Sequence, residues 1–68
     1  MAANERIEQG IDLEEEIKNI EIRLIERALE ISGGSQIQAA RLLNIKHTTL
    51  NAKIKRYGIN HKEIIFAE

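Results

Sequence analysis

Residues 35–58 read SQIQAARLLNIKHTTLNAKIKRYG and contain five basic side chains and no acidic one. Two short helices joined by a tight turn need a small residue where they cross and apolar residues that hold the pair together. Ala39 and Ala40 provide the small surface. The apolar contacts are expected from Leu43, Ile45, Leu50 and Ile54. The spacing predicts a helix-turn-helix, with Leu42 or Ile37 turned toward a preceding helix.

The ends of these two helices are marked by residues that favour caps and turns. Ser35, followed three residues later by Gln38, forms a capping box that opens the first helix. Asn44 tolerates positive φ, so a tight turn is expected there. Gly58 follows the second helix as a C-terminal stop. The predicted helices span about residues 36–43 and 47–57.

A longer helix is predicted before them. Asp12 and Glu15 form another capping box, and Gly33-Gly34 provides the left-handed geometry that ends a helix. The helix should therefore span about residues 13–32. Proline is absent and β-branched alternation is missing, so the expected fold class is all-α.

The chain divides into three expected segments. Residues 1–11 are predicted to be a flexible N-terminal linker, and residues 12–59 a helical domain. Residues 60–68 are predicted to be a C-terminal tail, in which Asn60 and Glu63 can cap a short helical turn.

The long helix has two apolar stripes, whereas a helix that packs only on its own domain needs one. The first stripe has a spacing close to that of a coiled-coil seam and is assigned to a partner subunit. Its residues are Leu13, Ile17, Ile20, Leu24, Ala28 and Ile31, and the first five are predicted to form the dimer interface. The second stripe, Ile22, Ile25 and Leu29, is assigned to the short helices. Two alternatives stay open: the reverse assignment, and a monomer that buries both stripes in one core.

Size and charge narrow the function. A chain of 68 residues is marginal as a monomer, and it has no cysteine for a disulfide or a Cys-based zinc site. Residues 1–34 carry nine acidic and four basic side chains, whereas residues 35–68 carry six basic and two acidic ones. A basic face attracts phosphates, which makes nucleic acid the first partner to consider; a solvated charged face is the alternative. Because no segment is apolar enough for a membrane span or a signal peptide, we expect a soluble, cytoplasmic protein.

The string GGSQIQAARLLNIKHTTLNAKIKRYGI, preceded by EIRLIERALEIS, resembles the Fis-type DNA-binding domain that closes bacterial enhancer-binding proteins of the NtrC class, the sigma-54-dependent activators. The matching residues are Gly33, Gly34, Ser35, Ala39, Ala40, Leu42, Leu43, Ile45, Thr49, Leu50, Lys53, Ile54, Lys55, Tyr57, Gly58 and Ile59. The likeness covers about residues 12–59. One departure is Asn44, where the family usually has glycine.

The resemblance implies a homodimer that is held by the N-terminal helices and binds an inverted repeat of double-stranded DNA, with some bending of the duplex. The class normally carries a receiver and an ATPase domain before this module. We therefore expect this chain to be an excised or isolated C-terminal domain, the DNA-binding module of a transcriptional activator.

The outward face of the second short helix is predicted to read bases in the major groove. An asparagine amide such as that of Asn51 can pair bidentately with adenine, and Lys55 can reach a guanine. The predicted base-reading residues are His47, Thr48, Asn51, Ala52 and Lys55. For each of them a solvated helical position is the alternative.

A second group is predicted to bind phosphates, which orient the protein without reading sequence. Its members are Ser35, Gln36, Lys46, Thr49, Lys53 and Arg56. Backbone amides at Ser35 and Gln36 can hold a phosphate through the helix dipole, and helix capping is an additional role for Ser35.

Other chemistry is not expected. His47 and His61 are fourteen residues apart without clustered acids, so neither a metal nor another cofactor is predicted. No nucleophile stands beside a base, so we expect neither an enzyme nor a small-molecule substrate. Two alternatives to sequence-specific binding remain: Fis-like architectural DNA bending with weak sequence preference, and a helical protein–protein dimerisation domain.

Overall fold

The computed structural model describes residues 7–59, and its regular secondary structure is entirely helical. A single 3-10 turn, η2 (Ile7–Gln9), lies within the segment that was predicted to be a linker. The three helices that follow are α1 (Leu13–Ile31), α2 (Gln36–Leu43) and α3 (His47–Tyr57). The predicted all-α class is confirmed. Residues 60–68, with the predicted turn at Asn60 and Glu63, lie outside the described residues.

The long helix α1 begins and ends at local hydrogen bonds. The Asp12 carboxylate accepts a hydrogen bond of 3.2 Å from the backbone N–H of Glu15, which satisfies one of the orphan donors of the first turn. At the other end, Gly33 and Gly34 have φ values of 66° and 92°. The Gly34 N–H donates to the Leu29 carbonyl at 2.8 Å, and this bond closes the helix one residue before the predicted end.

The turn between α2 and α3 is held in the same way. Ser35 Oγ accepts the Gln38 N–H at 3.2 Å and caps α2. Asn44 adopts the left-handed conformation with φ 62°, which asparagine tolerates better than most residues. The Ile45 N–H then bonds to the Ala40 carbonyl at 3.0 Å. The chain therefore reverses within a few residues and brings α3 back onto α2.

The two ends of α3 differ. Its N-cap, Lys46, makes no side-chain capping bond, whereas Gly58 at the C-terminal end has φ 66°. The Ile59 N–H donates to the Ile54 carbonyl at 3.0 Å, and Ile59 is buried, as in a Schellman stop.

One apolar core joins the three helices. Its buried members are Ile25, Ala28, Leu29, Ala39, Ala40, Leu50, Ile54 and Ile59. Leu29 of α1 and Leu50 of α3 are the largest fully buried side chains. The small Ala39 and Ala40 of α2 are also buried, which allows the helix backbones to approach closely. Ile22, Leu43, Ile45 and Tyr57 pack against this core while remaining partly exposed.

Two expectations were wrong in detail. Ala28, assigned to the partner interface, is only 4% exposed and belongs to the core of its own chain. The reason is the position of α2 and α3, which cover more of the C-terminal half of α1 than its stripes indicated. Either Ile37 or Leu42 was expected to contact the long helix. Each of them is 55% exposed, because Ala39 and Ala40 form the inward face of α2 instead.

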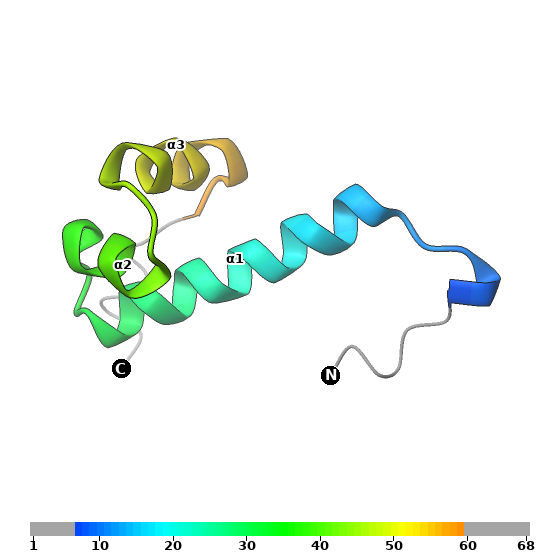
Figure 1. The fold of residues 1–68 in the computed structure, drawn as a ribbon, viewed down its shortest axis with the longest axis horizontal. Helices are drawn as coiled ribbons and strands as arrows, with labels where there is room; N and C mark the ends of the chain where they lie inside the picture. Colours follow the sequence, from blue (N-terminus) through cyan, green and yellow to red (C-terminus); the bar gives the residue numbers. More distant parts are fainter. Residues whose placement is uncertain (1–6, 60–68) are drawn as a thin grey trace.

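Figure 1 shows that α1 extends beyond the short helices. Its C-terminal half lies against α2, with α3 above, whereas its N-terminal half projects away from them. The first stripe leaves exposed apolar side chains along α1, three in this projecting half (Leu13 66%, Ile17 46% and Ile20 39%) and Leu24, 53% exposed, just beyond it. No helix within residues 7–59 is long and apolar enough to cross a membrane.

Candidate nucleic-acid interface

The second helix of the helix-turn-helix, α3, presents one face to the core and the opposite face to solvent. Leu50 and Ile54 are buried and lie on the inward face. At about 100° per residue, Thr48 and Ala52 lie nearly opposite them, and both are exposed. The solvent-facing side of α3 is therefore free of large apolar groups.

The predicted base-reading residues all lie on or beside this outward face. Thr48, Ala52 and Lys55 are exposed on it, and His47 is exposed at the helix start. Asn51 stands on the flank and is partly buried, so it projects less than the others. The structure thus brings these five residues together along one helix.

The predicted phosphate-binding residues lie on α3, at its N-cap and at the N-terminus of α2. Lys46, Thr49 and Arg56 are exposed around α3. Ser35 and Gln36, both partly buried, lie at the N-terminus of α2, where the Ser35 hydroxyl already accepts the capping bond from Gln38.

Lys53 is placed differently from what its basic character suggested. Its ammonium donates to Glu21 Oε1 of α1 at 2.9 Å, and the two side chains are only 27% and 31% exposed. On the helical wheel Lys53 points to the side of α3 that meets α1, away from Ala52. Within this structure the charge of Lys53 is therefore paired inside the protein.

Glu21 also accepts a hydrogen bond of 2.5 Å from the Tyr57 hydroxyl, and Lys53 Nζ lies 6.0 Å from the centre of the Tyr57 ring. The hydrogen bonds from Tyr57 and then Lys53 lower the pKa of the Glu21 carboxyl, against a smaller opposing effect of desolvation. The bond to Glu21 in turn raises the pKa of the Tyr57 hydroxyl. Both shifts favour the observed state, a carboxylate that accepts from a neutral phenol and an ammonium.

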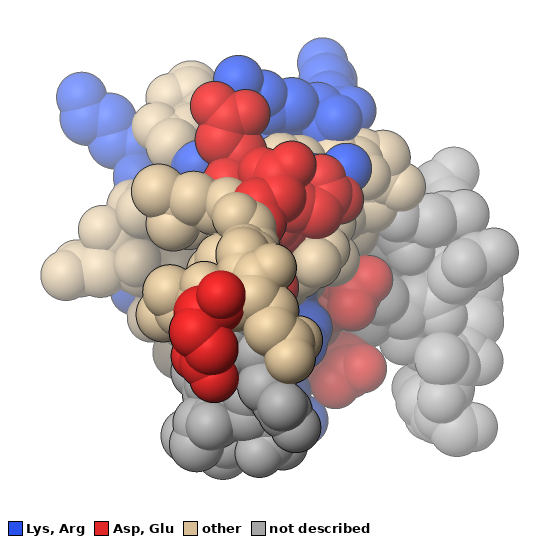
Figure 2. All heavy atoms as spheres, turned by 90° about the vertical axis from the view of Figure 1, so that its right-hand side faces the viewer, with Lys and Arg blue, Asp and Glu red and all other residues tan. Residues whose placement is uncertain are grey.

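Charge is divided between the helices. In Figure 2 the basic side chains gather along the upper edge, where α3 lies, and acidic side chains lie below them on the end of α1 that faces the viewer. The segment from Lys46 to Gly58 contains four basic residues and no acidic one. A polyanion is therefore attracted to α3 rather than to the N-terminal turns of α1.

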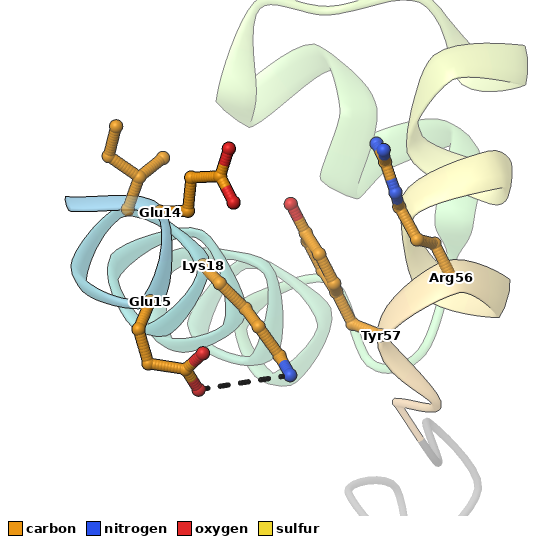
Figure 3. A pocket seen from close by; sticks show the side chains of 6 residues that line it. Glu14, Glu15, Lys18, Arg56 and Tyr57 are labelled. Atoms are coloured by element: carbon orange, nitrogen blue, oxygen red, sulfur yellow. Dashed lines mark ion pairs between the residues drawn. The ribbon is translucent and has the colours of Figure 1, made fainter. Parts of the chain in front are cut away.

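An open cleft of about 390 Å³ separates these two charged regions. Glu14, Glu15 and Lys18 project into it from α1, and Arg56 and Tyr57 from α3 (Figure 3). Glu15 and Lys18 form an exposed ion pair at 4.0 Å. Among the described residues, no group of His, Asp or Glu side chains is placed to hold a metal ion.

Glu21 and Tyr57 were absent from the predicted site. A signal for both was present: Glu21 stands one turn before the buried Ile25 on the inward side of α1. Tyr57 and Lys53 are four residues apart and so lie on one face of α3. An acidic residue on an inward face calls for a partner, but sequence alone does not say which residue of another helix meets it.

Comparison with known proteins shows the family to which this helix-turn-helix belongs. Residues 16–57 match the family described as "Bacterial regulatory protein, Fis family". The nitrogen fixation protein AnfA of Azotobacter vinelandii is 40% identical over 53 residues, which cover 78% of this chain and 10% of AnfA. The chain thus spans about a tenth of the length of this relative. No solved structure gives a significant match. The predicted resemblance to a Fis-type helix-turn-helix is confirmed.

The polar contact around Glu21 predicts a pH dependence of folding. Because the folded-state pKa of Glu21 is lowered, its contribution to stability is complete above the ordinary carboxyl pKa and is lost as the pH falls through the lowered value. Glu21→Gln should therefore show a shallower loss of unfolding free energy on acidification, measured by denaturant titration at a series of pH values. Tyr57→Phe should give an intermediate slope. Equal slopes in the wild-type protein and Glu21→Gln would contradict the coupling.

Proposed function

The chain belongs to the Fis family of bacterial regulatory proteins, and on this premise we propose that it binds a specific double-stranded DNA site as a homodimer. DNA binding is the property of the helix-turn-helix family to which residues 16–57 belong. Beyond DNA binding, we propose that the protein is a homodimer, that it prefers a particular DNA sequence, and that this sequence is an inverted repeat. The observation that carries the proposal is the outward face of α3, which is exposed and lacks both acidic and large apolar side chains.

In the proposed complex, α3 enters the major groove. That groove is about 12 Å wide and admits an α-helix, and its base edges distinguish all four base pairs. His47 and Thr48 at the helix start and Ala52 at the centre are small or short enough to let the helix approach the bases. Asn51 would pair with an adenine from the flank, and Lys55 would reach a guanine.

Phosphates on either side of the groove orient the helix in this proposal. Lys46 and Arg56 stand near the two ends of α3, so each is placed to meet a different part of the backbone. Thr49 and the N-terminus of α2, at Ser35 and Gln36, supply further donors. We leave Lys53 out of this set because Glu21 holds its ammonium.

The proposed dimer is held by α1. Leu13, Ile17, Ile20 and Leu24 follow a spacing of four, three and four residues, and all are exposed in the single chain. Such a stripe is stable in water when a second helix covers it. Two copies related by a two-fold axis would present two α3 helices, and a two-fold dimer fits an inverted repeat.

We further propose that the chain serves as the DNA-binding module of a bacterial transcriptional activator of the NtrC class. The support is its resemblance to that class and its match to a limited part of a much longer nitrogen fixation protein. Acting on bacterial DNA would place it in the cytoplasm.

The experiment that tests the proposed function is selection from a random duplex pool at physiological salt, followed by sequencing of the retained DNA. We expect an enriched inverted repeat with half-sites about one helical turn apart. Retention without a common motif would favour architectural binding with DNA bending. If nothing is retained, the DNA-binding proposal is wrong, and a protein–protein dimerisation domain becomes the better interpretation.

Base reading and phosphate binding are separated by two matched variants. Asn51→Ala should cost about 1–3 kcal/mol on the selected site and little on random DNA, because only the former presents the base edge that the amide reads. Arg56→Ala should weaken binding to both duplexes alike and reduce the salt slope by about one unit, because it removes one phosphate contact. Affinity is measured by fluorescence anisotropy at several salt concentrations. Equal losses from Asn51→Ala on both duplexes would exclude a base contact there.

Dimerisation through α1 is tested with charged substitutions. The double variant Ile17→Lys with Leu24→Lys should sediment as a monomer and bind DNA poorly, because two desolvated like charges would face their copies across the seam. The control is Ile37→Lys with Leu42→Lys, which exchanges the same residue types at similarly exposed positions on α2 and should remain dimeric. A dimeric first variant would place the interface elsewhere.

A further inference from the structure

Three polar side chains join α1 to the end of α3. The Glu21 carboxylate of α1 accepts hydrogen bonds from Lys53 Nζ at 2.9 Å and from the Tyr57 hydroxyl at 2.5 Å. The Lys53 ammonium lies 6.0 Å from the centre of the Tyr57 ring, so each of the three groups interacts with the other two. We call this group the Glu21 cluster.

The cluster lies where the apolar core ends. On α1, Glu21 precedes the buried Ile25 by one turn, between the core face and the exposed stripe that contains Ile20 and Leu24. On α3, Lys53 and Tyr57 occupy the last two turns, on the side that meets α1. The cluster therefore borders the core and the proposed dimer seam and also includes two residues of α3.

Polar and apolar contacts constrain the helix in different ways. Burial of Leu50 and Ile54 holds α3 on the domain, but the hydrophobic effect is non-directional and tolerates small rotations of a helix. Hydrogen bonds to a carboxylate depend on both distance and angle, and those that involve a charged group are the stronger ones. One carboxylate that receives two donors from successive turns of α3 therefore restricts how that helix can turn relative to α1.

A single exposed ion pair would not suffice for this, since such pairs contribute little. The Glu21 cluster differs in two respects. Its lysine and glutamate are only 27% and 31% exposed, and the carboxylate is shared with a phenol that packs against the core. The pair Arg27–Glu30 on the same helix shows the contrast: it is 71% and 50% exposed and joins two residues of α1 only.

We infer that Glu21, Lys53 and Tyr57 form a positioning clamp that sets the orientation of α3 relative to α1. The clamp thereby sets the distance between the two DNA half-sites to which the proposed dimer can bind. This inference rests on the proposed homodimer bound to an inverted repeat. In such a dimer the distance and relative orientation of the two α3 helices depend on two things. One is the packing of the two α1 helices at the seam, and the other is the angle between each α3 and the α1 of the same chain. The clamp acts on the second of these.

The consequence differs from that of a DNA contact. A residue that touches phosphate changes the affinity for every duplex and the salt slope. A positioning residue changes which duplexes fit. Each base pair inserted between the half-sites rotates one of them by about 35° relative to the other, so a rigid dimer should reject it.

The experiment uses the full chain and duplexes that carry the selected half-sites, with the spacer shortened or lengthened by one and two base pairs. For the wild-type protein we expect the affinity to fall about tenfold for a shift of one base pair, comparable to the loss of a base contact. For Glu21→Ala we expect this penalty to shrink to about threefold, as for the loss of a coupling between neighbouring groups. Glu30→Ala, which removes the same charge from the exposed pair with Arg27, is the matched control and should behave like the wild-type protein.

Folding is monitored by circular dichroism, and binding is measured well below the melting temperature of each variant. Lys53→Met keeps the aliphatic stem and removes the charge, so it should reproduce the broadened spacing preference. The double variant of Glu21→Ala with Lys53→Met should broaden it no further, because both changes remove one interaction.

The outcomes separate the clamp from the function on which it rests. If the wild-type protein shows no spacing preference, the homodimer on an inverted repeat is wrong, and the clamp's proposed role fails with it. If the wild-type protein discriminates and Glu21→Ala discriminates equally, only the clamp is refuted. If Lys53→Met instead lowers the salt slope by about one unit on all duplexes while Glu21→Ala does not, Lys53 is a phosphate ligand and the clamp is excluded.

Discussion

The close approach of α2 to both of its neighbours is the constraint on which the other features depend. Ala39 and Ala40 are almost completely buried, and their small side chains let α2 lie against α1 while it also supports α3. Larger residues at these positions would push the helices apart and open the space that Leu29 and Leu50 fill. Because α3 is held by this packing, the direction of its outward face follows from two residues that never touch a ligand.

Backbone hydrogen bonds in the loops close the end of each helix. Gly34 and Ile59 each donate a backbone hydrogen bond that closes the preceding helix, and Ile45 does so after α2. The left-handed conformations that these closures need are taken by glycine or, at position 44, by asparagine. Because these closures leave only a short turn between α2 and α3, the angle at which the two helices cross is fixed, as in other helix-turn-helix motifs.

Acidic and basic side chains are concentrated on different helices of the molecule. The acidic residues concentrate on α1 and the basic ones around α3, so the helix that carries the apolar proposed dimer seam and the helix that forms the proposed DNA surface have opposite charge. Lys53 is the exception that links them, since it belongs to the basic helix by sequence but bonds to Glu21 of α1. In the proposed function the basic charge of α3 therefore serves two purposes, attraction of phosphate and, through Lys53, attachment of α3 to α1.

The sequence by itself determined the helical class, the turn residues and the outward face of α3, because capping boxes, left-handed glycine positions and the period of apolar residues are local properties. It also placed Leu50 and Ile54 correctly on the inward side. Only the tertiary structure decided how far along α1 the short helices reach, which moved Ala28 into the core and left Ile37 and Leu42 outside. It likewise decided that Lys53 and Tyr57 meet Glu21, over thirty residues away in the chain. Such pairings depend on the crossing of two helices, and no local pattern encodes a crossing.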